Sequence, residues 1–144
     1  MSDASPVLGS LRPRVPASPR PGHMIRSLAC SFRYAFQGAY YVLKTQRNAR
    51  IQMGIGLLAA AVGLWVGLTP MEWAVLVLTV CLVLGAEMAN TALEALSDAT
   101  CPNPHPLVKV AKDVAAGSVL VMAAGSVVVG LLILGPPLLR LLAR

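Results

Sequence analysis

The stretch IQMGIGLLAAAVGLWVGLTPM, residues 51–71, contains 21 residues and no charged side chain. A helix of about 20 apolar residues crosses the roughly 30 Å hydrocarbon core of a bilayer, so this stretch predicts a membrane-spanning helix. Two further runs of this kind follow, one beginning at Trp73 and one of 26 residues between Asp113 and Arg140. We therefore expect an all-α membrane protein with three transmembrane helices, at about 50–69, 72–97 and 108–135.

The composition of the whole chain agrees with a lipid environment. Hydrophobic residues make up 56% of the 144 residues and charged residues only 12%, against roughly 25% in soluble globular domains. The net charge of +6 would also suit nucleic-acid binding, but aromatic-rich readout patterns and soluble helices are missing. We expect the basic residues to face a membrane surface, and we expect no nucleic acid as a partner.

The distribution of lysine and arginine predicts an orientation in the membrane. Eight of the twelve basic residues lie between Arg12 and Arg50, ahead of the first apolar run. If the three spans alternate in direction, Lys109 and Lys112 fall on the same side as these eight. Basic residues mark the cytoplasmic side, so we expect a multi-pass protein of the inner (plasma) membrane with its N-terminus in the cytoplasm.

The segment ahead of the first span divides at about residue 25. Residues 1–24 hold five prolines and three arginines without an apolar run, which predicts a disordered cytoplasmic tail rather than a signal peptide. Residues 25–45 mix aromatic and basic side chains, which favours an amphipathic helix on the membrane surface, with an irregular tether as the alternative. Residues 25–144 are expected to form one membrane domain.

The second apolar run ends in GAEMANTALEALSD, residues 85–98, which carries three of the six acids of the chain. At about 100° per residue, five polar side chains of this stretch share little more than a quarter of the helix circumference. A charged side chain in the bilayer core costs roughly 3 kcal/mol, so this face is predicted to point at other helices or a wet cavity. The five residues are Glu87, Asn90, Thr91, Glu94 and Asp98.

Lys112 and Asp113 open the third span, and we expect them at the same depth as these acids. One carboxylate of such a cluster can accept a proton, another can hold a divalent cation, and a lysine suits phosphate. Together these groups are the parts of phosphoryl transfer, although the chain contains no P-loop sequence to hold a nucleotide. Two structural alternatives stay open, namely a solvated helix end and salt bridges of the acids with Lys112 and Arg50.

The motif EMANTALEALSD (87–98), followed by AKDVAAGS (111–118), resembles the signature of the prokaryotic integral-membrane diacylglycerol kinase family, which includes the undecaprenol kinases. The resemblance covers residues 26–135 and includes SFRYAFQGAYYVLKTQRNARIQ (31–52). It implies a homotrimer of three-helix protomers with a surface helix, and active sites shared between neighbouring protomers at the cytoplasmic interface. It also implies Mg²⁺-dependent transfer of phosphate from ATP to a membrane lipid alcohol.

Carried over residue by residue, the resemblance implies a role for each of ten side chains. Glu87 would be the general base, and Glu94 would bind the magnesium that accompanies ATP. The other nucleotide-binding residues would be Tyr34, Gln46, His105, Lys112 and Asp113. The substrate-binding residues would be Arg50, Asn90 and Ala116.

Two positions bear on the details of this resemblance. Gln46 stands where many family members have a second metal-binding glutamate, and an amide carbonyl binds magnesium more weakly than a carboxylate does. The sequence AAGS at 115–118, which contains Ala116, is more similar to the undecaprenol kinases than to the diacylglycerol branch. Both lipid alcohols remain candidates for the substrate.

Two other classes of function remain open from the sequence. A small proton-coupled transporter would also use carboxylates within the membrane, although the acids gather toward one face and no inverted repeat is visible. An assembly or anchoring subunit would need no chemistry, but it leaves the polar face of residues 87–98 unexplained. Only a kinase is expected to be stabilised by Mg-ATP analogues.

Overall fold

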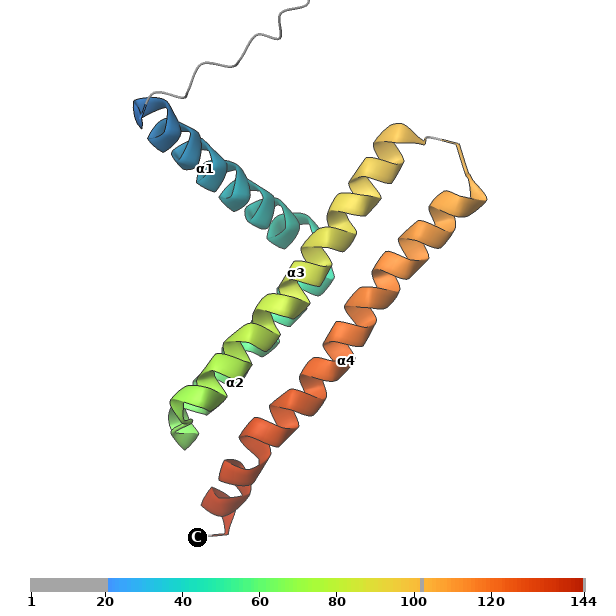
Figure 1. The fold of residues 1–144 in the computed structure, drawn as a ribbon. Helices are drawn as coiled ribbons and strands as arrows, with labels where there is room; N and C mark the ends of the chain where they lie inside the picture. Colours follow the sequence, from blue (N-terminus) through green and yellow to red (C-terminus); the bar gives the residue numbers. More distant parts are fainter. Residues whose placement is uncertain (1–20, 102, 144) are drawn as a thin grey trace, which may run out of the picture. The chain divides into compact units, whose positions relative to one another are not determined.

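The computed structural model describes residues 21–101 and 103–143 of the chain. Within these ranges the chain forms four α-helices and no strand. Figure 1 traces the course of these helices. The prediction of an all-α protein is confirmed. Most of the segment predicted as a disordered tail, residues 1–20, lies outside the described residues. The helices are α1 (Pro21–Thr45), α2 (Arg47–Val66), α3 (Pro70–Thr100) and α4 (Pro106–Leu142).

The chain divides into two units, residues 1–36 and 37–144. Of the first unit the structure describes the N-terminal part of α1, in which every side chain from Leu28 to Phe36 is exposed. The aromatic side chains of this part, Phe32, Tyr34 and Phe36, are 60%, 68% and 73% exposed. Large exposed aromatic side chains suit a membrane interface, and the location of α1 on a membrane surface stays a prediction.

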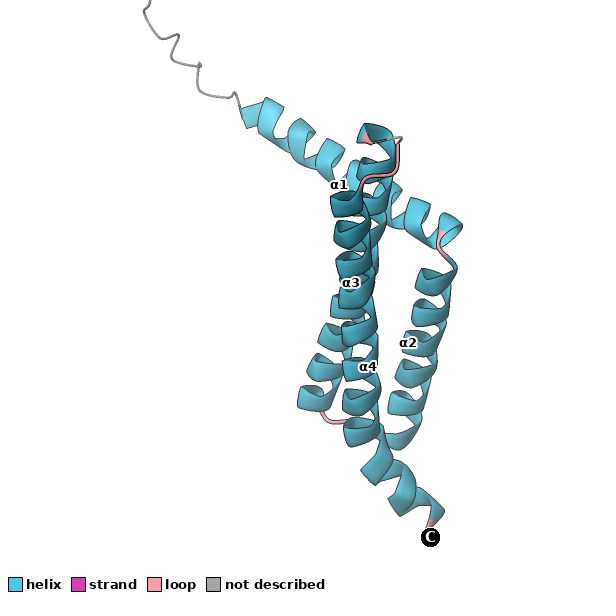
Figure 2. Cartoon of the chain, turned by 90° about the vertical axis from the view of Figure 1, so that its right-hand side faces the viewer, coloured by secondary structure: helices cyan, strands magenta, loops and turns pink. Residues whose placement is uncertain are grey.

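In the second unit, α2, α3 and α4 run alternately up and down beside one another (Figure 1 and Figure 2). Helix α3 makes its most extensive contacts with α4, and α2 contacts both. Each of the three is long and apolar enough to cross a membrane, so the prediction of three spans is confirmed. Most large apolar side chains of the spans, such as those of Leu57, Leu64 and Leu131, are exposed, as lipid-facing side chains would be.

The turn between α2 and α3 is built by local capping. Gly67 ends α2 with a φ of 73°, in the left-handed region that glycine adopts at low cost, and its N–H donates to Gly63 O at 3.1 Å. Thr69 begins α3 through a capping box, because its hydroxyl oxygen accepts from the Glu72 N–H while its own N–H donates to the Glu72 carboxylate at 2.7 Å. Glu72 is thereby assigned to helix capping, at the opposite end of α3 from the other acids.

Helix α4 extends beyond its predicted limits of 108–135, to Pro106 at one end and Leu142 at the other. It passes through Pro136 and Pro137, which lack the N–H that an interior helical position normally donates. Transmembrane helices tolerate proline where other groups satisfy the backbone. The helix continues past both prolines to Leu142.

Candidate active site

The polar face of α3 is buried within the bundle at Glu87. This side chain is only 3% exposed, and Asn90 and Thr91, one turn later, are 9% and 4% exposed. The prediction that this face points away from lipid is therefore confirmed for these three residues. The side chain of Gln52, on α2, lies close to the Glu87 carboxylate, so a neighbouring helix places an amide beside this acid.

Hydrogen bonds tie the polar face together along α3. Asn90 Nδ2 donates to Glu94 Oε1 at 3.1 Å, and the Thr91 hydroxyl donates to the Glu87 backbone oxygen at 2.9 Å. Asn90 Oδ1 is buried and has no hydrogen-bond partner. A buried acceptor without a partner is costly, so it marks a place where a ligand could supply a donor. We call Gln52, Glu87, Asn90, Thr91 and Glu94 the inner cluster.

A second group of charged residues lies where the loop 101–105 joins α3 to α4. The Lys112 Nζ pairs with Asp98 Oδ1 at 2.8 Å, and the Lys109 Nζ pairs with Asp113 Oδ2 at 2.6 Å. These side chains border a cavity of about 740 Å³. We call the acidic, basic and histidine residues that line this cavity, Asp98, His105, Lys109, Lys112 and Asp113, the rim cluster.

The inner cluster and the rim cluster lie at different depths, so the prediction of a single depth is wrong. A helix rises about 1.5 Å per residue, which separates Glu87 from Asp98 by roughly 16 Å along α3. Their environments differ accordingly, because Glu87 is buried while the Asp98 side chain is 72% exposed. A straight helix cannot bring Glu87, Glu94 and Asp98, which are spread over three turns, to one level.

His105 belongs to the rim cluster and also begins α4. Its Nδ1 accepts a hydrogen bond from the Leu107 N–H at 3.2 Å, which caps the first turn of the helix. A neutral imidazole whose Nδ1 accepts carries its proton on Nε2. The capping bond therefore leaves Nε2 as a donor beside the cavity.

Four other residues predicted to belong to the site are not joined to either cluster by a described contact. Tyr34 belongs to the first unit and is exposed. Gln46 precedes the first residue of α2, and its side chain makes no capping hydrogen bond. Arg50 uses its Nη1 to hold the Lys44 backbone oxygen at 3.0 Å, where α1 ends. Ala116 lies exposed on α4.

Comparison with known proteins identifies the family to which this chain belongs. Residues 33–134, which include both clusters and all three spans up to the last turns of α4, match the family described as prokaryotic diacylglycerol kinase. The chain belongs to the prokaryotic diacylglycerol kinase family. The family predicted from the motif at 87–98 is thereby confirmed, and the chain is a multi-pass membrane enzyme of the lipid kinase class with ATP as the co-substrate that the family implies.

Two relatives of this chain carry different names within this family. A protein named diacylglycerol kinase from Synechocystis sp. is 45% identical over 117 residues, which cover 81% of this chain and 67% of the relative. A protein named undecaprenol kinase from Bacillus subtilis is 36% identical over 108 residues, which cover 75% of this chain and 88% of the relative. The two names differ in the lipid alcohol, so they leave both candidates in place.

A metal ion for this kinase has to be held by few protein groups. No three His, Cys, Asp or Glu side chains gather as a metal site among the described residues. Magnesium is normally held by one or two carboxylates together with phosphate oxygens of the nucleotide. Glu94 fits this arrangement, because Asn90 occupies only its Oε1. The donor chemistry suits magnesium that arrives with ATP and does not suit a cage made by the protein alone.

Gln52 is a candidate site residue that the sequence analysis missed. It is the one amide side chain in the uncharged run 51–71, and a strongly polar side chain within a span is itself a signal of function. Its neighbour Glu87 lies on another helix, so no spacing rule within one segment could bring the two together.

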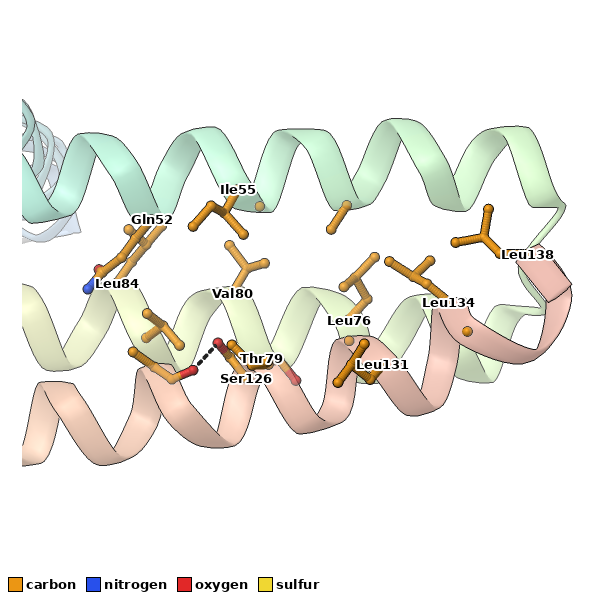
Figure 3. Close-up of a pocket in the computed structure, with 17 residues that line it drawn as sticks. Gln52, Ile55, Leu76, Thr79, Val80, Leu84, Ser126, Leu131, Leu134 and Leu138 are labelled. Carbon is orange, nitrogen blue, oxygen red and sulfur yellow. Dashed lines mark hydrogen bonds between the residues drawn. The ribbon is translucent and has the colours of Figure 1, made fainter.

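Gln52 also borders a second, apolar cavity of about 450 Å³ between α2, α3 and α4, shown in Figure 3. Three polar side chains line this cavity, those of Gln52, Thr79 and Ser126. The hydroxyls of Thr79 and Ser126 donate to backbone oxygens of their own helices, at 2.8 and 2.7 Å. Gln52 differs from both, because its Oε1 is buried and has no hydrogen-bond partner.

Proposed function

We propose that this kinase transfers the γ-phosphate of ATP to the hydroxyl of a membrane lipid alcohol, at the cytoplasmic interface of the inner membrane. The observation that carries the proposal is Glu87, a carboxylate 3% exposed within a membrane helix. Ionisable groups in such positions are costly and are kept for function. The acceptor is diacylglycerol or undecaprenol, the two alcohols that the names of the relatives suggest.

Glu87 is proposed as the general base. It would take the proton of the lipid hydroxyl while the hydroxyl oxygen attacks the γ-phosphorus and the bond to the departing ADP oxygen breaks. The unpartnered Asn90 Oδ1 lies one turn away and supports a role for Asn90 in lining the site of the alcohol. We expect direct in-line transfer without a phosphorylated enzyme, since one base and a bound nucleotide suffice.

The rim cluster is proposed as the phosphate-binding part of the site. Lys112 would exchange Asp98 for a phosphate oxygen, with the His105 Nε2 and Asp113 contributing nearby. Exposed ion pairs contribute about 0–1 kcal/mol, so the exchange would cost little. Glu94 lies between Glu87 and Asp98 along α3 and would hold magnesium, which supplies positive charge to the phosphates when bound. Tyr34, Gln46, Arg50 and Ala116 complete the proposed binding residues.

The assembly is proposed to be a homotrimer with the N-terminus of each chain in the cytoplasm. The motif at residues 87–118 carries this proposal, because the family that it resembles implies active sites shared between neighbouring protomers. Co-assembly of Glu87→Gln and Lys112→Met chains, each inactive or weak alone, should restore activity if sites are shared between chains. Activity no higher than that of the better variant alone would contradict shared sites.

The experiment that tests the proposed function is phosphorylation by radiolabelled ATP in lipid nanodiscs. Undecaprenol and diacylglycerol are offered in parallel, with magnesium present and Glu87→Gln as the control. Label in one lipid, absent with the control, supports the kinase and selects its substrate. Absence of label in both lipids from folded protein would contradict the proposal and return the proton-coupled transporter to consideration.

A further inference from the structure

A third cavity, of about 400 Å³, lies at the end of the bundle away from both clusters. It is lined by the turn from α2 to α3 and by the last turns of α4, which lie at the same end of the bundle in Figure 1 and Figure 2. Two charged side chains border this cavity, those of Glu72 on α3 and Arg140 on α4. Neither has a role in the proposed kinase reaction.

The two charges of this cavity do not neutralise each other directly. In the part of the chain that the structure describes, ion pairs form only within the rim cluster, so none joins Glu72 to Arg140. The Arg140 Nε lies 3.4 Å from Pro136 O, which is a long contact, and its two Nη groups have no hydrogen-bond partner among the described residues. A guanidinium offers five N–H donors, so most of those of Arg140 remain available to a ligand.

The Glu72 carboxylate uses its two oxygens differently. Its Oε2 accepts from the N–H and from the hydroxyl of Thr69, both at 2.7 Å, within the capping box of α3. Its Oε1 has no hydrogen-bond partner among the described residues. A donor with a positive charge can therefore bind Oε1 while the capping box stays intact. The same cavity thus offers a place for an anion at Arg140 and one for a cation at Glu72.

The position of this cavity along the helices matches the headgroup layer of a membrane. Glu72 and Asp98 are separated by roughly 39 Å along α3, close to the 40–45 Å thickness of a bilayer with both headgroup layers included. With the rim cluster at one interface, Glu72 lies at the other. Trp65, which also lines the cavity, is 69% exposed, and tryptophan is enriched at membrane interfaces.

We propose that this cavity binds the headgroup of a zwitterionic phospholipid with a primary ammonium, in the leaflet opposite the proposed kinase site. Arg140 donates to the phosphate oxygens, since a guanidinium suits bidentate binding of phosphate. The ammonium donates to Glu72 Oε1, which a trimethylammonium headgroup cannot do because it has no N–H. An anionic headgroup would leave Glu72 without a partner. The site does not rest on the proposed kinase function.

Thermal unfolding of the full chain in nanodiscs tests the proposal. Phosphatidylcholine alone is compared with mixtures that contain an equal fraction of phosphatidylethanolamine or of phosphatidylglycerol. Phosphatidylethanolamine should raise the Tm by about 3–6 °C, the shift that a site occupied about nine times in ten implies for a chain of this length. Phosphatidylglycerol should produce less than half of this rise. Equal Tm values in all three membranes, or an equal rise with both lipids, would overturn the proposal.

Two variants remove one charge each. Arg140→Gln and Glu72→Gln should each abolish the rise with phosphatidylethanolamine and unfold as the wild type does in phosphatidylcholine. Glutamine can still form the capping box, so Glu72→Gln reports the charge. Thr69→Ala is the matched control, because it weakens the same turn and keeps both charges; it should lower the Tm equally in every membrane and keep the rise. Losses of equal size in every membrane from both glutamine variants would indicate a direct interaction of Glu72 with Arg140 and overturn the lipid site.

Two further measurements address the source of the headgroup and the folding of the variants. Soluble phosphoethanolamine, added to phosphatidylcholine nanodiscs, should leave the Tm unchanged, because no lipid tail concentrates it at the membrane surface. A rise as large as that with the lipid would assign the cavity to a soluble ligand and overturn the proposal. Native mass spectrometry gives a result from the wild type alone if a variant does not fold. The full chain should retain phosphatidylethanolamine in preference to phosphatidylglycerol, and equal retention of the two would contradict the site.

Discussion

The inner cluster and the rim cluster both contain carboxylates, but they hold them in opposite ways. In the inner cluster one acid is almost fully buried and lies close to oxygens that lack hydrogen-bond partners. In the rim cluster each lysine is paired with an aspartate and the side chains are mostly exposed. Burial holds side chains in place and makes each polar atom without a hydrogen-bond partner costly in free energy. Exposed ion pairs, in contrast, exchange partners at little cost. The difference suits chemistry at the first cluster and exchange of phosphate ligands at the second.

Apart from the loss of the proposed base Glu87, the largest effect among the tests of this comparison is expected at Lys112. Lys112→Met should raise the KM for ATP by about tenfold to a hundredfold, because a charge-assisted hydrogen bond contributes roughly 1.5–3 kcal/mol. The KM for lipid should change much less. Steady-state kinetics in nanodiscs measures both constants.

Lys109 provides the matched control for Lys112. Both lysines line the same cavity, but the Lys109 side chain is 78% exposed and pairs with Asp113 within its own helix. Lys109→Met should raise the KM for ATP by less than about threefold. Equal effects of the two variants would contradict a specific phosphate-binding role for Lys112.

A smaller effect is expected at Asn90, within the inner cluster. Asn90→Leu removes the donor to Glu94 Oε1 and the free acceptor Oδ1. We expect kcat to fall about tenfold, as the loss of one or two buried hydrogen bonds implies, and the magnesium concentration for half-maximal activity to rise. Titration of magnesium at saturating ATP measures both. A normal magnesium requirement would mean that Asn90 does not act through Glu94, the proposed metal ligand.

Gly63 lies at the end of the bundle away from both clusters. A substitution there tests whether stability can change without a change in activity. A Cβ at this position would lie 2.8 Å from Leu68 Cδ1 and 3.3 Å from the Trp73 ring. Gly63→Val should destabilise the protein by roughly 1–3 kcal/mol through overpacking, without altering kcat below the unfolding temperature. Thermal unfolding in nanodiscs, followed by an activity assay in the cold, checks this. A loss of kcat from folded Gly63→Val would mean that activity responds to packing anywhere in the bundle.

The smallest effect is expected at the capping box of α3. Thr69→Ala removes the side chain that caps the Glu72 N–H and should cost about 1 kcal/mol of stability with no effect on kinetics. Glu72→Gln is the control, because glutamine can still form the box. A larger loss from Glu72→Gln would show that the charge of Glu72 has a role beyond capping.

The spans and the polar face of α3 could be predicted from the sequence because each is a property of one continuous segment. An uncharged run such as 51–71 and a helical spacing such as that of Glu87 to Glu94 need no knowledge of neighbours. The pairing of Asp98 with Lys112 joins two different helices. It depends on how far α4 slides along α3, which no single segment encodes. The prediction of a single depth failed for another reason, because the rise along α3 separates Glu87 from Asp98 by roughly 16 Å.

The most direct test of the division between the two clusters is a single-turnover measurement on Glu87→Gln with Mg-ATP and the preferred lipid. Nucleotide binding is measured on the same sample. It is detected as the thermal stabilisation that a non-hydrolysable ATP analogue produces. We predict that Glu87→Gln binds nucleotide as the wild type does and transfers phosphate at least about a hundredfold more slowly, as loss of a general base implies. Transfer at the wild-type rate would contradict Glu87 as the base, and loss of nucleotide binding would contradict the separation of the inner cluster from the rim cluster.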